Sequence, residues 1–281
     1  MSRGLRSAAL HGVLLLGAVL AASPLLWMVS ASLMRPGEAN SSPPPLLPSA
    51  PTLEHYRALF TSLSLGRYLL NSVVISVGGT LLGVLIMSLA GYAFAKLRFP
   101  GRDPVFRLLV AGMAIPGQVA MLPMFLLLRE MGLINTLFGA MIPVLAPIYG
   151  VFLVRQYALS IPSDLLDAAR LDGASEFRIF RTIVLPTIAP VLATLGVFSF
   201  LSSWNDFMWP LIVLSDDARY TLPVALANLV GEHVLDVELM MAGSVVTILP
   251  VFLAFLFLQR YYIQGTIWRS EERRVGKECR S

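Results

Sequence analysis

The ionisable side chains lie outside the central parts of the long apolar runs, where proton or ion chemistry inside a membrane would need them. Only 14% of the 281 residues are charged, and no Asp, Glu, Lys, Arg or His lies in the central part of a long apolar run. Ionisable groups at such positions are costly and usually form proton relays or ion sites. Their absence argues against a proton-coupled carrier whose coupling residues lie in this chain. It also argues against a strongly charged solute being neutralised here.

The residue types that serve nucleotide or metal chemistry are also wrongly spaced. No phosphate-binding loop and no nucleophile elbow occurs in the sequence. His11, His55 and His233 lie far apart near the edges of apolar runs, which favours surface groups over metal ligands. The single cysteine, Cys279, allows no disulfide and no Cys-based metal site within one chain. We therefore expect a protein that is not an enzyme and binds no cofactor itself.

The polar groups inside the apolar runs are mostly neutral amides and hydroxyls. Most of them are expected to bond from helix to helix or to their own backbone. A minority could line a path for a neutral polar solute, especially near the break at Pro116-Gly117. Our candidates for such a path are Asn71, Gln118, Trp204, Asn205 and Asp206.

Residues 167–186 stand out as a polar, helix-forming stretch between two long apolar runs. Ser163 is expected to cap a helix that runs from Asp164 to about Asp172. Gly173 is expected to end this helix in the left-handed conformation. The pattern therefore predicts a short helix with a defined stop.

A second short helix is expected to follow. Ser175 can cap it, and Phe177, Phe180 and Val184 would then share one face. Pro186 suits the first turn of the apolar run that comes next.

Two interpretations of this loop remain open from the residues alone. Leu165, Ala168 and Ala169 fall at i, i+3 and i+4, so they form a flat apolar face that another backbone can approach closely. That face could pack on the chain's own helices, or it could dock on another protein.

The elements around this loop are expected to be transmembrane helices. With 56% hydrophobic residues and mean hydropathy +0.74, the composition predicts an all-α membrane protein with several spans. A span needs roughly 20 apolar residues. The first run continues through Leu25 to Val29, longer than a signal-peptide core, and is expected to stay uncleaved. The six expected spans are about 12–34, 68–94, 106–128, 136–157, 187–204 and 241–262.

The distribution of basic residues predicts the orientation. With the N-terminus inside, 16 of the 21 Lys and Arg residues fall on the cytoplasmic side and 5 outside, as the positive-inside rule requires. Both termini and the loop 158–186 are then cytoplasmic. The net charge of +4 does not suggest nucleic acid, because the basic residues lie in short segments between apolar runs. Residues 205–240 hold six acidic residues and one basic residue, which fits a solvated loop or a docking surface for an external partner.

The loop resembles the signature of ABC importer permeases, written EAA-x3-G-x9-I-x-LP. Asp167-Ala168-Ala169, Gly173, Ile183 and Leu185-Pro186 stand at every required offset. The one departure is Asp167, a shorter carboxylate where the family usually has Glu.

Other segments are similar to the carbohydrate-type importers, the subfamily with maltose and glycerol-phosphate permeases. This resemblance runs from the first span to Gly265 and points to the second, six-span permease of the pair. The segments that carry it are Tyr92–Ala95, Phe99–Gly101, Gln118–Val119, Met121–Pro123, Gly132–Thr136, Trp204–Pro210 and Thr221–Val224.

The resemblance implies a type I importer fold with a cytoplasmic coupling helix in the bacterial inner membrane. It implies a second permease, two ATP-binding subunits that hold ATP and Mg, an extracytoplasmic solute-binding protein, and a sugar or polyol as the solute. Segment 164–181 would supply the coupling helix. The residues that would couple to the ATPase are Asp167, Ala168, Ala169, Arg170, Asp172, Gly173, Phe177, Phe180, Ile183, Leu185 and Pro186.

The C-terminal end departs from the family pattern. We expect residues 1–268 to form the permease domain, and the abruptly charged residues 269–281 to be foreign to it. Two other classes remain as alternatives to the importer: a secondary carrier and a membrane scaffold, both without ATPase partners.

Overall fold

The computed structural model describes residues 3–232 and 236–256. Within these residues the chain is helical and contains no β-strand, which confirms the all-α prediction. The chain divides into two compact units, Met1–Arg67 with Leu222–Pro250, and Tyr68–Thr221 with Val251–Ser281. Residues 269–281 lie outside the described residues.

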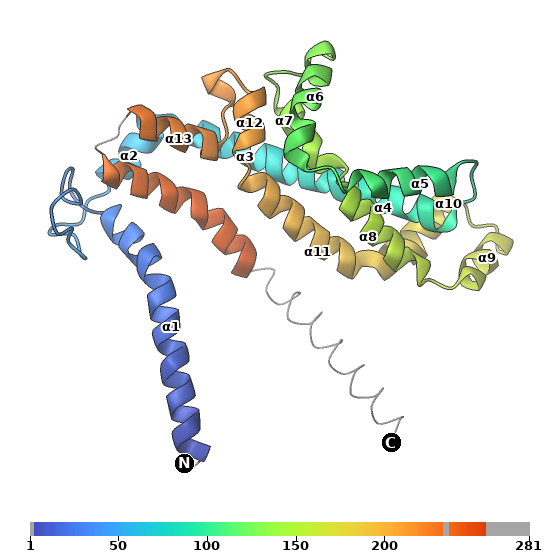
Figure 1. The fold of residues 1–281 in the computed structure, drawn as a ribbon, viewed down its shortest axis with the longest axis horizontal. Coiled ribbons are helices and arrows are strands. Elements are labelled where there is room, and N and C mark those ends of the chain that lie inside the picture. The colour runs from blue at the N-terminus through green and yellow to red at the C-terminus, as the bar shows by residue number, and fades with distance from the viewer. Residues whose placement is uncertain (1–2, 233–235, 257–281) are drawn as a thin grey trace. The chain divides into compact units, whose positions relative to one another are not determined.

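The described part of the first unit contains long apolar helices, shorter helices and an irregular segment. Its elements are α1 (Arg3–Ala31), α2 (Glu54–Thr61), α13 (Leu222–Glu232) and the start of a last helix, Val237–Leu256 (Figure 1). Ala31, Met34 and Ala39 form its small core with partly buried Trp27 and Met241. The apolar window of α1 buries nothing inside the chain, so its side chains are available to lipid or to another subunit.

Two buried ionisable residues hold the irregular segment of this unit. Glu238 is fully buried, and its Oε1 accepts the Ala39 N–H at 2.7 Å. His55 Nε2 lies 3.0 Å from the Met34 carbonyl oxygen. The surface position expected for the histidines is therefore wrong for His55. The last helix begins at Val237, earlier than expected, which places Glu238 in its first turn.

The second unit contains the helices that surround the loop 163–186. Its helices are α3 (Leu65–Val73), α4 (Gly79–Lys96), α5 (Arg102–Gly112), α6 (Gly117–Glu130), α7 (Leu137–Leu145), α8 (Ile148–Leu159), α9 (Ser163–Leu171), α10 (Glu176–Ile179), α11 (Leu185–Trp204) and α12 (Met208–Val213). Two π-helical turns, Val74–Gly78 and Phe180–Val184, and a 3-10 turn, Asp217–Arg219, complete it.

The core of the second unit lies between α4, α8 and α11, which pack side by side (Figure 1). Met87, Val154 and Ile188 are fully buried members of this core. Glycine allows α4 and α8 to approach closely, because a Cβ atom on Gly91 would overlap the side chain of Val154. The α9 loop lies beyond the ends of α8 and α11.

Among the described residues, four helices are long and apolar enough to cross a membrane: Leu10–Ala31, Leu65–Lys96, Glu176–Trp204 and Val237–Leu256. They overlap the spans expected at 12–34, 68–94, 187–204 and 241–262, of which residues 257–262 lie outside the described residues. Gly78 and Gly79 do not interrupt the second of these helices, because the π-helical turn Val74–Gly78 continues it.

The other two expected spans are bent pairs of helices. α5 and α6 meet at 112°, and α7 and α8 meet at 42°. Both bends lie just before a proline, Pro116 or Pro147, which removes a helical N–H and disfavours helical geometry in the preceding residue. The chain reaches six spans when each bent pair is taken as one, but 106–128 is not the single straight helix that hydropathy suggests.

The loop joins the helix that follows it without a break. The short helix expected after Ser175 continues through Phe180–Val184 into α11 as one helix, Glu176–Trp204. In the π-helical turn the Leu185 N–H bonds to the Phe180 carbonyl, one residue further back than in an α-helix. Pro186 lies in the first turn of α11, as the sequence predicted, and the π-helical turn before it makes α10 and α11 one continuous helix.

Candidate functional site

The α9 helix ends in a Schellman motif. Gly173 has φ +82°, its N–H bonds to the Arg170 carbonyl, and the Ala174 N–H bonds to the Ala169 carbonyl, both at 3.0 Å. These two bonds satisfy carbonyls that the helix end leaves free. The predicted left-handed stop at Gly173 is confirmed.

The two expected serine caps differ in outcome. Ser175 Oγ accepts the Arg178 N–H at 3.3 Å, so the second cap is confirmed. Ser163 does not cap α9; it is the first helical residue, and Pro162 occupies the cap position with no side-chain bond. Pro162 has ψ 131°, an extended conformation, and the helix begins at the next residue, Ser163.

One side of α9 is anchored in the core of the second unit. Leu166 is 1% exposed and belongs to the same apolar cluster as Met87 and Tyr92 of α4. Ala169 is partly buried against that cluster, whereas Ala168 is exposed. The predicted face of Leu165, Ala168 and Ala169 is thus not the packing face, which is centred on Leu166.

The aromatic face predicted for the second helix is split. Phe180 and Val184 are buried, but Phe177 is 70% exposed. The π-helical turn adds one residue per turn and rotates the residues before it away from those after it. The ring of Phe180 packs on Tyr92 with centroids 5.6 Å apart. Ile183 and Leu185 are partly buried against the same core, and Pro186 is exposed.

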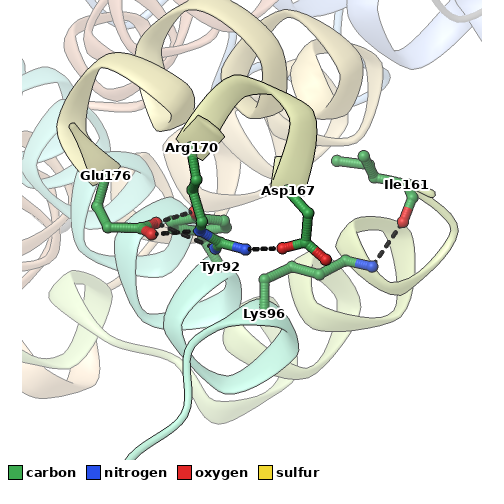
Figure 2. Close-up of polar contacts among 6 residues, drawn as sticks. All are labelled: Tyr92, Lys96, Ile161, Asp167, Arg170 and Glu176. Atoms are coloured by element: carbon green, nitrogen blue, oxygen red, sulfur yellow. Dashed lines mark hydrogen bonds and ion pairs between the residues drawn. The ribbon is translucent and has the colours of Figure 1, made fainter. Parts of the chain in front are cut away.

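An ion-pair network spans the turn at Gly173 (Figure 2). Arg170 Nη1 donates to Asp167 Oδ1 at 2.6 Å, and Arg170 Nε donates to Glu176 Oε1 at 2.7 Å. The carboxylates of Glu176 and then Asp167 raise the pKa of the Arg170 guanidinium above its ordinary value. A single guanidinium therefore joins the last turns of α9 to the first residue of α10.

The network reaches α4 through Tyr92, and a separate pair of bonds from Lys96 ties the end of α4 to the residues just before α9 (Figure 2). The Tyr92 hydroxyl donates to Glu176 Oε2 at 2.6 Å. Lys96 Nζ donates to the Ile161 carbonyl at 2.5 Å and to the Leu159 carbonyl at 3.4 Å. A lysine at these carbonyls satisfies acceptors that the end of α8 leaves free.

Large apolar side chains remain exposed around the turn. Leu171 is 91% exposed, Phe177 70% and Leu165 50%. Asp172, next to Gly173, is also exposed. The loop therefore presents exposed apolar side chains on both of its helices, Leu165 and Leu171 on α9 and Phe177 on α10, while Leu166 of α9 is held in the core.

The candidates for a solute path do not form one cluster. Asn71 is buried, and its amide donates to the carbonyls of Ala218 and Tyr220 at 3.0 Å each. Gln118 is exposed in the first turn of α6. Among the described residues, no contact joins these two.

The other three path candidates follow one another at the C-terminal end of α11, where Trp204 is the last helical residue. Trp204 is buried and stacks on Phe200 with centroids 5.7 Å apart. Asn205 Nδ2 donates to the Leu201 carbonyl at 2.8 Å. Asp206 accepts the Trp209 N–H at 3.3 Å and so holds the start of α12. In this conformation each of these three residues is engaged with its own surroundings.

Sequence reasoning missed Leu166, Tyr92, Lys96 and Glu176 as parts of the loop's support. The Ser175-Glu176 pair after a helix stop was a local signal for a capped turn. The pairing of Tyr92 with Glu176 had no local signal, because it joins residues far apart in the sequence. Within the ranges 3–232 and 236–256, no group of three or more His, Cys, Asp or Glu residues could hold a metal ion.

The fold and the loop are those of a known class of transport protein. Residues 79–267 match the family described as binding-protein-dependent transport system inner membrane component. The matched segment includes the α9 loop and α11. The chain belongs to this family and is the transmembrane subunit of a binding-protein-dependent ABC importer.

Individual relatives are similar over nearly the whole chain. The arabinooligosaccharides transport system permease protein AraQ of Halalkalibacterium halodurans is 39% identical over 251 residues, 88% of this chain and 90% of that protein. The diacetylchitobiose uptake system permease protein NgcG of Streptomyces coelicolor is 32% identical, over 89% of this chain and 84% of that protein. Family membership sets aside the alternatives of a secondary carrier and a scaffold.

A solved structure supports the type I importer fold. A subunit of a bacterial ABC transporter involved in the import of alginate, an acidic polysaccharide, has a TM-score of 0.80 and 25% identity. The similarity covers 93% of this chain and 99% of that one. The fold predicted from the signature is confirmed.

Proposed function

We propose that this chain is one of two permeases of an ATP-driven importer for neutral sugars, oligosaccharides or polyols. The sugar class is supported by the names of the relatives, which include permeases for arabinooligosaccharides and for diacetylchitobiose. That the solute carries no charge is supported by the absence of ionisable residues from the central parts of the expected spans. The chain supplies half of the translocation path, and Asn71, Gln118 and Trp204-Asn205-Asp206 are its path candidates.

The α9 loop is the proposed contact with an ATP-binding subunit. The observation that carries this proposal is the exposure of Leu165 and Leu171 on α9, which buried Leu166 anchors, and of Phe177 on the adjoining α10. Exposed apolar surface on a polar loop is typical of a protein interface. The predicted coupling residues, from Asp167 to Pro186, then divide into exposed contacts and buried supports.

The orientation follows from the basic residues. We place the loop and both termini in the cytoplasm of a bacterium, since most Lys and Arg residues fall on that side. A second permease, two ATP-binding subunits with ATP and Mg, and an extracytoplasmic solute-binding protein complete the complex. The partner subunits, and not this chain, hydrolyse ATP.

The solute class is tested with the binding protein encoded beside this chain. A panel of neutral sugars and polyols is titrated against that protein, with a charged sugar phosphate of similar size as the matched control. The proposal predicts micromolar binding of at least one neutral sugar or polyol, as is typical for specific sites. Selective binding of the sugar phosphate alone would refute the neutral class.

A further inference from the structure

We propose that Glu176, with Arg170 and Tyr92, transmits the motion of α9 directly to α4, so that these two helices move as one body. This inference rests on the proposed docking of α9 on the ATP-binding subunit. It adds a defined route inside the permease, from the docked helix to the span Leu65–Lys96.

The first support is that one carboxylate joins three elements (Figure 2). Glu176 is the first residue of α10; its Oε1 accepts from Arg170 of α9 at 2.7 Å, and its Oε2 accepts from Tyr92 of α4 at 2.6 Å. Arg170 Nη2 also donates to Glu176 Oε2 at 3.4 Å, so the guanidinium contacts both carboxylate oxygens, and such bidentate pairs fix direction as well as distance. A displacement of α9 therefore pulls on α4 through two short hydrogen bonds.

The second support is that apolar contacts follow the same route. Leu166 of α9 and Met87, Tyr92 and Ala95 of α4 belong to one buried cluster. Lys96 adds a further tie from the end of α4 to the Ile161 carbonyl, just before α9. Packed cores transmit displacement because they resist deformation.

The third support is the difference in burial along the network. Tyr92 is 3% exposed, whereas the side chains of Arg170 and Glu176 are 34% and 46% exposed. Exposed ion pairs contribute little to stability, so loss of this network should leave the fold intact. Loss of the network should instead weaken the transmission of movement from α9 to α4.

The test uses the complete transporter in lipid vesicles, with its binding protein and sugar. Tyr92→Phe removes one hydroxyl, and Glu176→Gln keeps the size of the side chain but removes its charge. We expect each variant to assemble normally and to lower the ratio of sugar transported to ATP hydrolysed by about tenfold, the factor for one hydrogen bond to a charged group. The double variant should be no worse than Glu176→Gln, because both changes break one chain of contacts.

The matched control is Tyr157→Phe. Tyr157 is 42% exposed on α8, and its hydroxyl bonds to no described residue, so this change should leave the ratio unchanged. Glu176→Asp should restore part of the ratio, because it keeps a carboxylate near Arg170.

Failure of this inference can be told apart from failure of the docking proposal. If the unaltered complex assembles and couples, but Tyr92→Phe and Glu176→Gln show its normal ratio, the route through Glu176 is wrong. A fall in uptake that only follows a fall in assembled complex also overturns it. If the unaltered chain does not bind the ATP-binding subunit at all, the docking proposal itself is wrong.

Discussion

Neighbouring residues of the α9 loop have opposite environments. Leu166 is buried, but Leu165 beside it is half exposed. Ala169 packs on the core while Ala168 is open to solvent. Substitutions at the exposed positions can therefore test docking without disturbing the fold.

At Ala168 the test is a charge at the proposed interface. Ala168→Glu should prevent the ATP-binding subunit from co-purifying, since an unpaired charge buried at an interface costs about 2 kcal/mol or more. Ala168→Ser is the matched control and should assemble normally. Recovery of the full complex with Ala168→Glu would rule out this face as the contact.

At Gly173 the test is backbone conformation. Gly173 has φ +82° and nothing within 4 Å of an added Cβ, so only strain opposes substitution. Gly173→Val should cost about 1–2 kcal/mol and uncouple ATP hydrolysis from uptake in vesicles. Gly173→Asn should be tolerated, because Asn adopts this conformation more readily. Equal uptake by the Val and Asn variants would show that the turn geometry is unimportant.

At the scale of elements, the sequence predicted those features that depend on residues close together along the chain. Gly173 has no Cβ and follows a helical pattern, so the left-handed stop could be read from the sequence. The Ser175 cap and the four continuous apolar helices could also be predicted from the sequence. Each depends on residues within a few positions of one another.

What depends on contacts between distant residues could not be read in this way. Pro186 lies in the first turn of α11 as predicted, but no local pattern predicted the π-helical turn that joins α10 to α11 in one continuous helix from Glu176 to Trp204. Proline also predicted a break at Pro116 but not its 112° angle. The bond from Tyr92 to Glu176 exists only because α4 and α10 come together in the fold.

The close approach of α4 and α8 gives a prediction at this scale. Gly91→Val should lower the free energy of unfolding by about 1–3 kcal/mol, because the new side chain would overlap Val154. Gly17→Val on α1, where nothing lies within 4 Å, is the matched control. Thermal unfolding in detergent compares the two. Equal midpoints would contradict the packing argument.

At the scale of the whole molecule, this chain is an inner membrane component of a binding-protein-dependent importer. The family match and the signature around Gly173 place it among permeases that depend on a binding protein. The exposed apolar surface of the α9 loop and the unburied apolar window of α1 are then surfaces for partners or lipid.

The most direct measurement is ATP hydrolysis by the purified complex in vesicles, with and without the sugar-loaded binding protein. We expect the loaded binding protein to raise ATP hydrolysis several-fold and sugar to accumulate only when ATP is present. The same complex with Ala168→Glu should show neither effect. Sugar accumulation without ATP, or hydrolysis that does not respond to the loaded binding protein, would contradict the account.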